Sequence, residues 1–130
     1  MANNNLDLAH SGKAVAFVYV TDRDRALSFY RDTLGLPVRD SDPYGDFLDL
    51  PGALLRLTTI EGFEPHPHPA LGFDVEDIEA VAAALRERGI AFDIFEGMGQ
   101  DVNGICAMPD GGKLAFFKDS EGNALMLSQT

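Results

Sequence analysis

The chain has 130 residues, of which 45% are hydrophobic and 24% are charged, and its formal net charge is −11 at pH 7. This length and composition are those of one compact globular unit, or of two very small ones fused, with enough residues for a core, and they argue against disorder. The excess of acidic residues argues against nucleic acid and against anionic membranes as partners.

The sequence offers little for disulfides or membrane targeting. Cys106 is the only cysteine, so the chain cannot form an internal disulfide or a thiolate metal cluster. The amino terminus lacks the basic start and apolar run of a signal peptide. The longest uninterrupted apolar run, residues 14–20, is far shorter than the ~20 residues that cross a bilayer. We therefore expect a cytoplasmic protein.

The first half of the chain predicts a strand, a helix and three further strands. Residues 1–12 are polar and predict a flexible tail. Residues 14–20, AVAFVYV, predict a strand that is buried on both faces. Asp22 is placed to cap a helix with one apolar stripe, and Gly35 suits the left-handed residue that ends it. Short strands follow over residues 36–39, 47–50 and 53–60, with a turn over 40–46.

The second half repeats this order after a linker. Residues 61–69, EGFEPHPHP, predict the linker because proline cannot donate to a strand ladder. Superposing Asp22 on Asp77 matches the two strand–helix units, which indicates two copies of one module, residues 13–60 and 70–130; a chance likeness is the alternative. The predicted elements are a strand over 70–75, a helix over 77–88 ended by Gly89, and strands over 90–95, 105–108, 114–118 and 123–127.

Three segments carry a resemblance to a known family: FVYVTDRDRALSFYRDTLGL, LGFDVEDIEAVAAALRERGI and LAFFKDSEGNALMLSQ. Together they resemble the glyoxalase / bleomycin-resistance / dioxygenase family, the vicinal oxygen chelate superfamily, over residues 13–129. The resemblance implies an α+β fold of two tandem βαβββ modules that form a curved mixed sheet around a pocket, with the helices on the outer face. It also implies a small-molecule ligand and a homodimer.

Many members of this family bind a divalent metal through His, Gln or Glu. The resemblance places the three usual ligand positions at Val15, Ala70 and Met126. Valine and alanine have no lone pair, and a thioether is a poor ligand for these ions. We therefore expect no cofactor. The alternative is an atypical divalent-metal site that uses His68 with a glutamate of the linker.

Strand alternation adds further candidates to the pocket. Phe17 and Tyr19 share a face with Val15, and Asp74 shares one with Ala70. Tyr19 and Asp74 hold matching places in the two modules, so they are candidate acid–base groups. The alternative is structural: the two aromatic side chains belong to the core, and Asp74 caps the second helix.

Arg56 interrupts an otherwise apolar strand, ALLRLTTI. A guanidinium at this place could hold a ligand carboxylate through two hydrogen bonds, and an exposed arginine on a half-solvated strand is the alternative. Cys106 has no evident activating partner and is read as a small buried hydrophobic residue. The expected ligand-binding residues are Val15, Phe17, Tyr19, Arg56, Ala70, Asp74 and Met126.

The leading functional hypothesis is a metal-free member of the family that binds a modest, partly apolar compound. The alternative is a glyoxalase-like isomerase or lyase, or a dioxygenase-type enzyme, that uses Tyr19 and Asp74 or an atypical metal site. A third hypothesis is a degenerate member that serves protein interactions.

Overall fold

A computed structural model of the chain describes residues 6–130, and its strands form two four-stranded sheets of the same topology. The first strand of each module runs parallel to the last strand, and the other neighbours are antiparallel. The prediction of an α+β fold with two βαβββ modules is confirmed. Sheet A is ordered β1 (Ala14–Val20), β4 (Ala53–Thr59), β3 (Gly45–Leu50) and β2 (Val38–Asp42), and sheet B is ordered β5 (Leu71–Asp74), β8 (Ala124–Gln129), β7 (Lys113–Lys118) and β6 (Cys106–Ala107).

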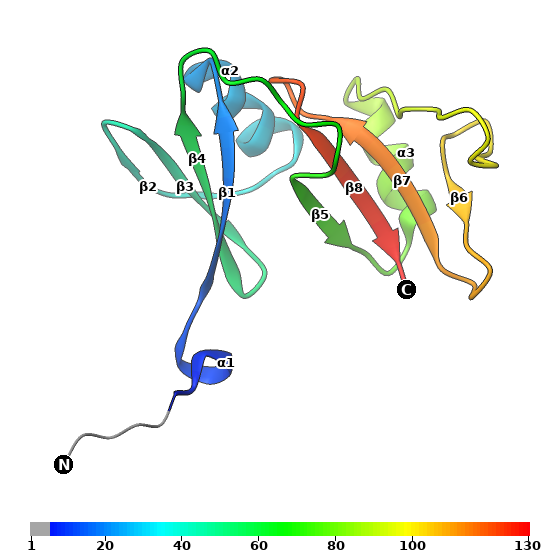
Figure 1. Cartoon of the computed structure of the whole chain (residues 1–130), viewed down its shortest axis with the longest axis horizontal. Coiled ribbons are helices and arrows are strands. Elements are labelled where there is room, and N and C mark those ends of the chain that lie inside the picture. The colour runs from blue at the N-terminus through cyan, green and yellow to red at the C-terminus, as the bar shows by residue number, and fades with distance from the viewer. Residues whose placement is uncertain (1–5) are drawn as a thin grey trace.

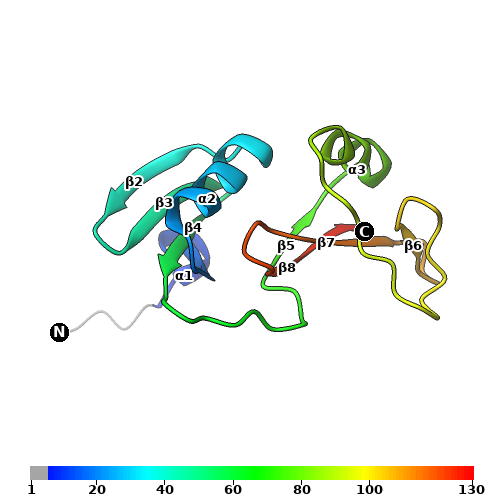
Figure 2. The same ribbon diagram turned by 90° about the horizontal axis from the view of Figure 1, so that it is seen from above.

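The two sheets lie side by side, with β1 at the edge of sheet A that is nearer to β5 (Figure 1). The helices of both modules cover one side of the sheets, and the linker of residues 61–69 crosses the other side (Figure 2). We call the side of the sheets opposite the helices the open face. Over residues 6–130 no strand of sheet A pairs with a strand of sheet B, so the strands make two sheets rather than one continuous curved sheet.

A capping aspartate begins the main helix of each module. Helix α2 (Arg23–Ser28) follows Asp22, and helix α3 (Ile78–Glu87) follows Asp77. Each carboxylate accepts a backbone N–H of the first helical turn at 3.1 Å. Such a bond satisfies a donor that the helix itself leaves unpaired, which is why aspartate is favoured here. The predicted helix starts are confirmed.

The last turn of the first helix is wider than predicted. Residues Phe29–Thr33 form a π-helical segment, η1, which ends with a backbone hydrogen bond of 3.0 Å to the carbonyl five residues earlier. The wide turn accompanies the burial of two adjacent aromatic side chains, Phe29 and Tyr30. Gly35 and Gly89 then follow the two helical segments with φ of 77° and 90°, a region that residues with a Cβ rarely adopt.

The hydrophobic core lies between the helices and the sheet faces beneath them. Its buried members form one cluster that includes residues of both modules, so the modules share a core. The largest fully buried side chains are Tyr30, Phe117, Leu48, Leu55, Leu57, Ile78, Leu125 and Leu127. No helix within residues 6–130 is long and apolar enough to span a membrane.

The prediction that residues 14–20 are buried on both faces is wrong for the single chain. Val18 and Val20 are buried toward the helix. Phe17 and Tyr19 point to the open face, where their side chains are 60% and 42% exposed. The uninterrupted apolar run of residues 14–20 therefore arises because one side of β1 faces the core and its other side forms an apolar surface.

The strand predicted over residues 90–95 is absent. Asp93 donates its N–H to the Phe116 carbonyl of β7 at 2.8 Å. The other hydrogen bonds of this segment are made by the side chain of Gln100 instead of by a neighbouring strand. Gln100 accepts the N–H of Phe95 at 2.7 Å and donates to the carbonyl of Asp93 at 2.9 Å. Periodicity could not reveal this, because Ile90 and Phe92 of the segment still pack on the core.

Two other segments differ from their predicted extents. The strand expected over residues 36–39 is β2, which continues to Asp42 because its hairpin with β3 extends to a turn at residues 43–44. The expected tail of residues 1–12 lies partly outside the described residues. Its described part contains a short helix, α1 (Leu8–Ser11), whose side chains are exposed.

Candidate functional site

The turn of residues 119–123, whose sequence DSEGN contributed to the resemblance, joins the two modules. The Tyr30 hydroxyl donates to the buried carboxylate of Asp119 at 2.6 Å. Asn123 donates to the same carboxylate and to the main-chain oxygen of Tyr19, both at 2.9 Å. Burial, together with the Asp119 carboxylate, raises the pKa of Tyr30, so the phenol remains a donor. Tyr30, Asp119 and Asn123 therefore hold the two modules together.

Glu121 anchors the same turn to the start of α2. Its carboxylate accepts the N–H of Asp22 at 2.8 Å, the N–H and hydroxyl of Thr21 at 3.1 and 3.0 Å, and Nε of Arg25 at 2.7 Å. Its side chain is 1% exposed. Burial by itself raises the pKa of this carboxyl, but the hydrogen bonds from Arg25 and from the α2 terminus outweigh it and lower the pKa to about 2. Nothing in the sequence distinguishes Glu121 from the other acidic residues.

A hollow of about 420 Å³ lies on the open face between β1 and the linker, and we call it the linker hollow. The rings of Tyr19 and Phe63 meet edge to face with centroids 5.4 Å apart, and the ring of His66 follows at 6.2 Å from Phe63. The structure thus brings three predicted residues, Phe17, Tyr19 and Ala70, to one hollow. Its lining is Phe17, Val18, Tyr19, Phe63, His66, His68, Pro69, Ala70 and Asn123.

A second hollow, of about 320 Å³, lies between the linker and β7. The rings of Phe95 and Phe116 form one wall, with centroids 5.6 Å apart. Lys118 lies on the same wall and pairs with Asp93 at 2.7 Å. His66 and His68 line both hollows, so the linker separates two aromatic surfaces.

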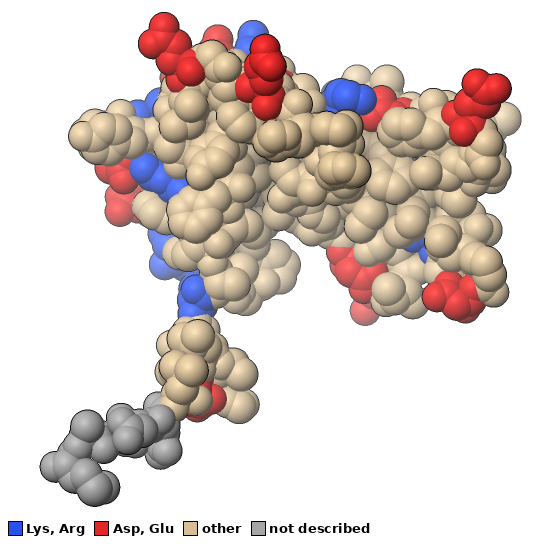
Figure 3. Space-filling model, in the orientation of Figure 1, with Lys and Arg blue, Asp and Glu red and all other residues tan. Residues whose placement is uncertain are grey.

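The open face carries few charges for so acidic a protein. In Figure 3, Lys, Arg, Asp and Glu lie mainly around the rim of this face, and other residues cover its middle. Large apolar side chains are exposed on it, among them Phe17, Tyr19 and Phe95. Contiguous exposed apolar surface usually marks a binding surface, because a soluble protein otherwise buries or interrupts it.

The three usual metal positions are not suited to a metal. Val15 faces the open side of sheet A, and Met126 is the cross-strand partner of Gly72 in sheet B; both lie outside the lining of the linker hollow. Val15 and Ala70 have no donor atom, and Met126 has only a thioether sulfur. Within residues 6–130 no three His, Cys, Asp or Glu side chains, His68 included, are grouped so that they could hold a metal.

Arg56 is neither exposed nor in a described hollow. It is 7% exposed, its Nη2 donates to Asp42 at 2.8 Å, and its guanidinium lies 4.6 Å from the centre of the Phe47 ring. The hydrogen bond from Arg56, with a backbone N–H of the turn, lowers the pKa of Asp42. Its buried Nη1 has no hydrogen-bond partner within the described chain. A ligand oxygen could reach this donor only if neighbouring side chains moved.

The two candidate acid–base groups are not assembled into one site. Tyr19 lines the linker hollow, whereas Asp74 lines a different one and accepts the hydroxyls of Ser128 and Thr130 at 2.8 and 3.0 Å. Asp74 does not cap α3, because Asp77 does.

The remaining candidate, Cys106, is buried, and its thiol donates to the main-chain oxygen of Met98 at 3.1 Å. No residue that would activate it is in hydrogen-bond contact within residues 6–130.

Comparisons with known proteins agree with this architecture. The family model described as Glyoxalase/Bleomycin resistance protein/Dioxygenase superfamily matches residues 12–127. A search of curated proteins gave no match.

Among solved structures, lactoylglutathione lyase from Agrobacterium tumefaciens is 18% identical, with a TM-score of 0.70 over 92% of this chain and 93% of that one. The glyoxalase family protein from Enterococcus faecalis is 24% identical, with a TM-score of 0.69 over 92% and 98%. The glyoxalase/bleomycin resistance protein/dioxygenase from Alicyclobacillus acidocaldarius is 19% identical, with a TM-score of 0.70 over 92% and 91%. At these identities the likeness shows the fold alone.

Proposed function

The chain belongs to the glyoxalase/bleomycin resistance protein/dioxygenase superfamily, and we propose that it is a metal-free member that binds a small, partly apolar molecule on its open face. The linker hollow carries this proposal. Its volume of about 420 Å³ suits a small organic molecule, and its aromatic side chains present ring faces and edges with a few polar atoms among them. Aromatic ligands gain most from such walls.

The proposal is tested by a thermal-shift screen of small aromatic compounds, followed by titration of each hit. We expect hits that raise the melting temperature of the natural chain, and we expect Phe17→Ala to weaken them at least fivefold. Tyr44→Ala is the matched control, because Tyr44 is an exposed aromatic residue outside the hollow. Hits that bind equally to both variants would place the ligand elsewhere and refute the assignment.

Metal independence is a separate part of the proposal and rests on the missing donors at Val15, Ala70 and Met126. Elemental analysis of the purified chain should give well below one equivalent of nickel, zinc, iron or manganese. Stoichiometric metal that Ala replacement of His68 removes would establish the atypical site instead.

We also propose that the protein acts as a homodimer in which a second copy covers part of the open face. The support is the apolar, weakly charged middle of that face and the free edges of β1 and β5. Light scattering after gel filtration should give twice the mass of one chain. A monomer at micromolar concentration would exclude this arrangement.

The rival function is enzymatic, and the likeness to a lactoylglutathione lyase structure is what favours it. The separation of Tyr19 from Asp74 weighs against these two groups acting together. Turnover of a methylglyoxal–thiol adduct, measured with and without added divalent metal, separates the two functions, since a binding protein gives no turnover in either case.

A further inference from the structure

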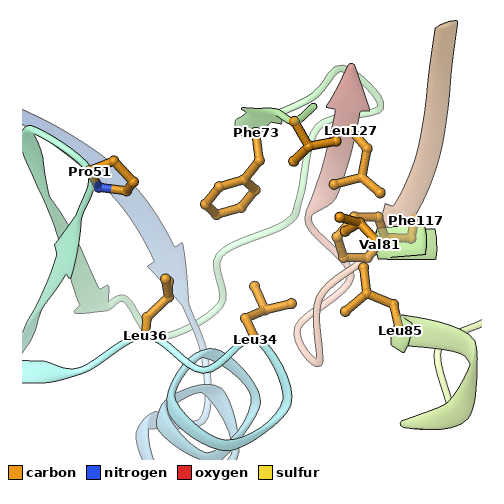
Figure 4. Close-up of a pocket in the computed structure, with 9 residues that line it drawn as sticks. Leu34, Leu36, Pro51, Phe73, Val81, Leu85, Phe117 and Leu127 are labelled. Carbon is orange, nitrogen blue, oxygen red and sulfur yellow. The ribbon is translucent and has the colours of Figure 1, made fainter. Parts of the chain in front are cut away.

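A separate hollow lies between the two modules on the helix side of the sheets, and we call it the apolar hollow. Its volume is about 220 Å³. Figure 4 shows Leu34 and Leu36 of the first module across from Phe73 and Leu127 of the second, with Leu85 of α3 beside them. All nine lining residues are apolar: Leu34, Leu36, Pro51, Phe73, Val75, Val81, Leu85, Phe117 and Leu127.

The apolar hollow has a buried floor and an accessible rim. Phe117 and Leu127 are 0% and 2% exposed, so they form the floor. Leu34 and Val81 are only partly buried, and Pro51 is exposed. A small molecule can therefore reach the hollow from the surface while both modules stay folded.

The lining of the apolar hollow determines which molecules it can hold. None of the nine side chains donates or accepts a hydrogen bond, so water inside it would lack the polar partners that bound water needs. A charged group carried inside would be unpaired at a large cost in free energy. An uncharged apolar molecule instead restores the dispersion contacts that an empty void lacks, and a cavity of about 150 Å³ is enough for benzene.

We propose that the apolar hollow binds a small uncharged apolar molecule, of the size of a monocyclic aromatic hydrocarbon. The ligand lies between Leu34 of the first module and Leu85 of the second, so it contacts both modules. Because it binds only when the modules are packed together, it stabilises the folded chain. This site does not depend on the linker hollow, which shares no lining residue with it.

The first test titrates toluene into the natural chain and follows the methyl groups by two-dimensional NMR. We expect the methyl signals of Leu34, Val81 and Leu85 to move together and to saturate, because the aromatic ring lies against them. Toluene at about ten times its dissociation constant should raise the melting temperature by about 5 °C. The same NMR shifts should remain in Phe17→Ala, which alters only the linker hollow. The absence of saturable shifts at these three residues would overturn the proposal.

The second test fills the apolar hollow from α3. Val81→Phe places a ring in the hollow, so it should weaken toluene at least tenfold. Ala84→Phe, on the exposed side of the same helix, is the matched control and should bind toluene as the natural chain does. If Val81→Phe does not fold, Val81→Leu is the smaller step and should weaken toluene at least threefold. An affinity for toluene that substitution of Val81 leaves unchanged would show that the ligand lies elsewhere.

Discussion

Neutralising Glu121 should loosen the junction between the modules. Its carboxylate is buried and accepts hydrogen bonds from Thr21, Asp22 and Arg25 across the junction. The pKa falls from 4.5 to about 2, which at about 1.4 kcal/mol per unit of pKa corresponds to about 3 kcal/mol of stabilisation at neutral pH. Glu121→Gln keeps the shape and removes the charge, so it should lower the free energy of unfolding by about 3 kcal/mol at pH 7.

The stabilisation by Glu121 should depend on pH in a definite direction. Because the pKa is lowered in the folded state, the stabilisation is complete above the unfolded pKa of 4.5 and is lost as the pH falls toward about 2. The difference between the natural chain and Glu121→Gln should therefore be about 3 kcal/mol at pH 7, shrink below pH 4.5 and nearly vanish near pH 2. Taking this difference cancels the titration of the other acidic residues, which both proteins share.

Urea unfolding followed by far-ultraviolet circular dichroism at pH 7, 5, 4 and 3 measures the difference, since the chain has no tryptophan for fluorescence. The melting temperature at pH 7 should fall by about 10 °C. Asp32→Asn is the control, because Asp32 pairs with Arg31 on the surface and its loss should have little effect. A difference below about 1 kcal/mol at pH 7, or one that is the same at pH 3, would refute the reasoning.

Two further changes test the packing. Tyr30→Phe removes the hydroxyl that donates to the buried Asp119 carboxylate, so it should lower the free energy of unfolding in urea by about 2 kcal/mol. An unchanged free energy of unfolding would show that another donor replaces the phenol. Gly45→Ala places a Cβ against the backbone oxygen of Leu57 and should prevent normal folding. Gly72→Ala is the control, because its Cβ would meet its neighbours at ordinary contact distances and the variant should fold. Equal melting temperatures for the two variants would contradict the described contact between β3 and β4.

The sequence by itself determined the modules and their local features. The aspartate caps and stop glycines act within a few residues of chain, so the pattern around Asp22 and Gly35 predicted the first helical segment correctly except for its π turn. Strand alternation likewise placed Phe17 and Tyr19 on one side of β1, because side chains of a strand alternate whatever surrounds them.

Only the tertiary structure decided which of these surfaces are buried and which partners the polar side chains contact. Glu121 contacts residues about a hundred positions away, and Gln100 replaces a strand partner; neither contact leaves a periodic signal. Arg56 of β4 is buried and pairs with Asp42 of β2, which lies two strands away in sheet A. The linker hollow and the apolar hollow lined by Leu34, Phe73 and Leu85 each combine residues of both modules, so they depend on long-range packing and not on any local pattern.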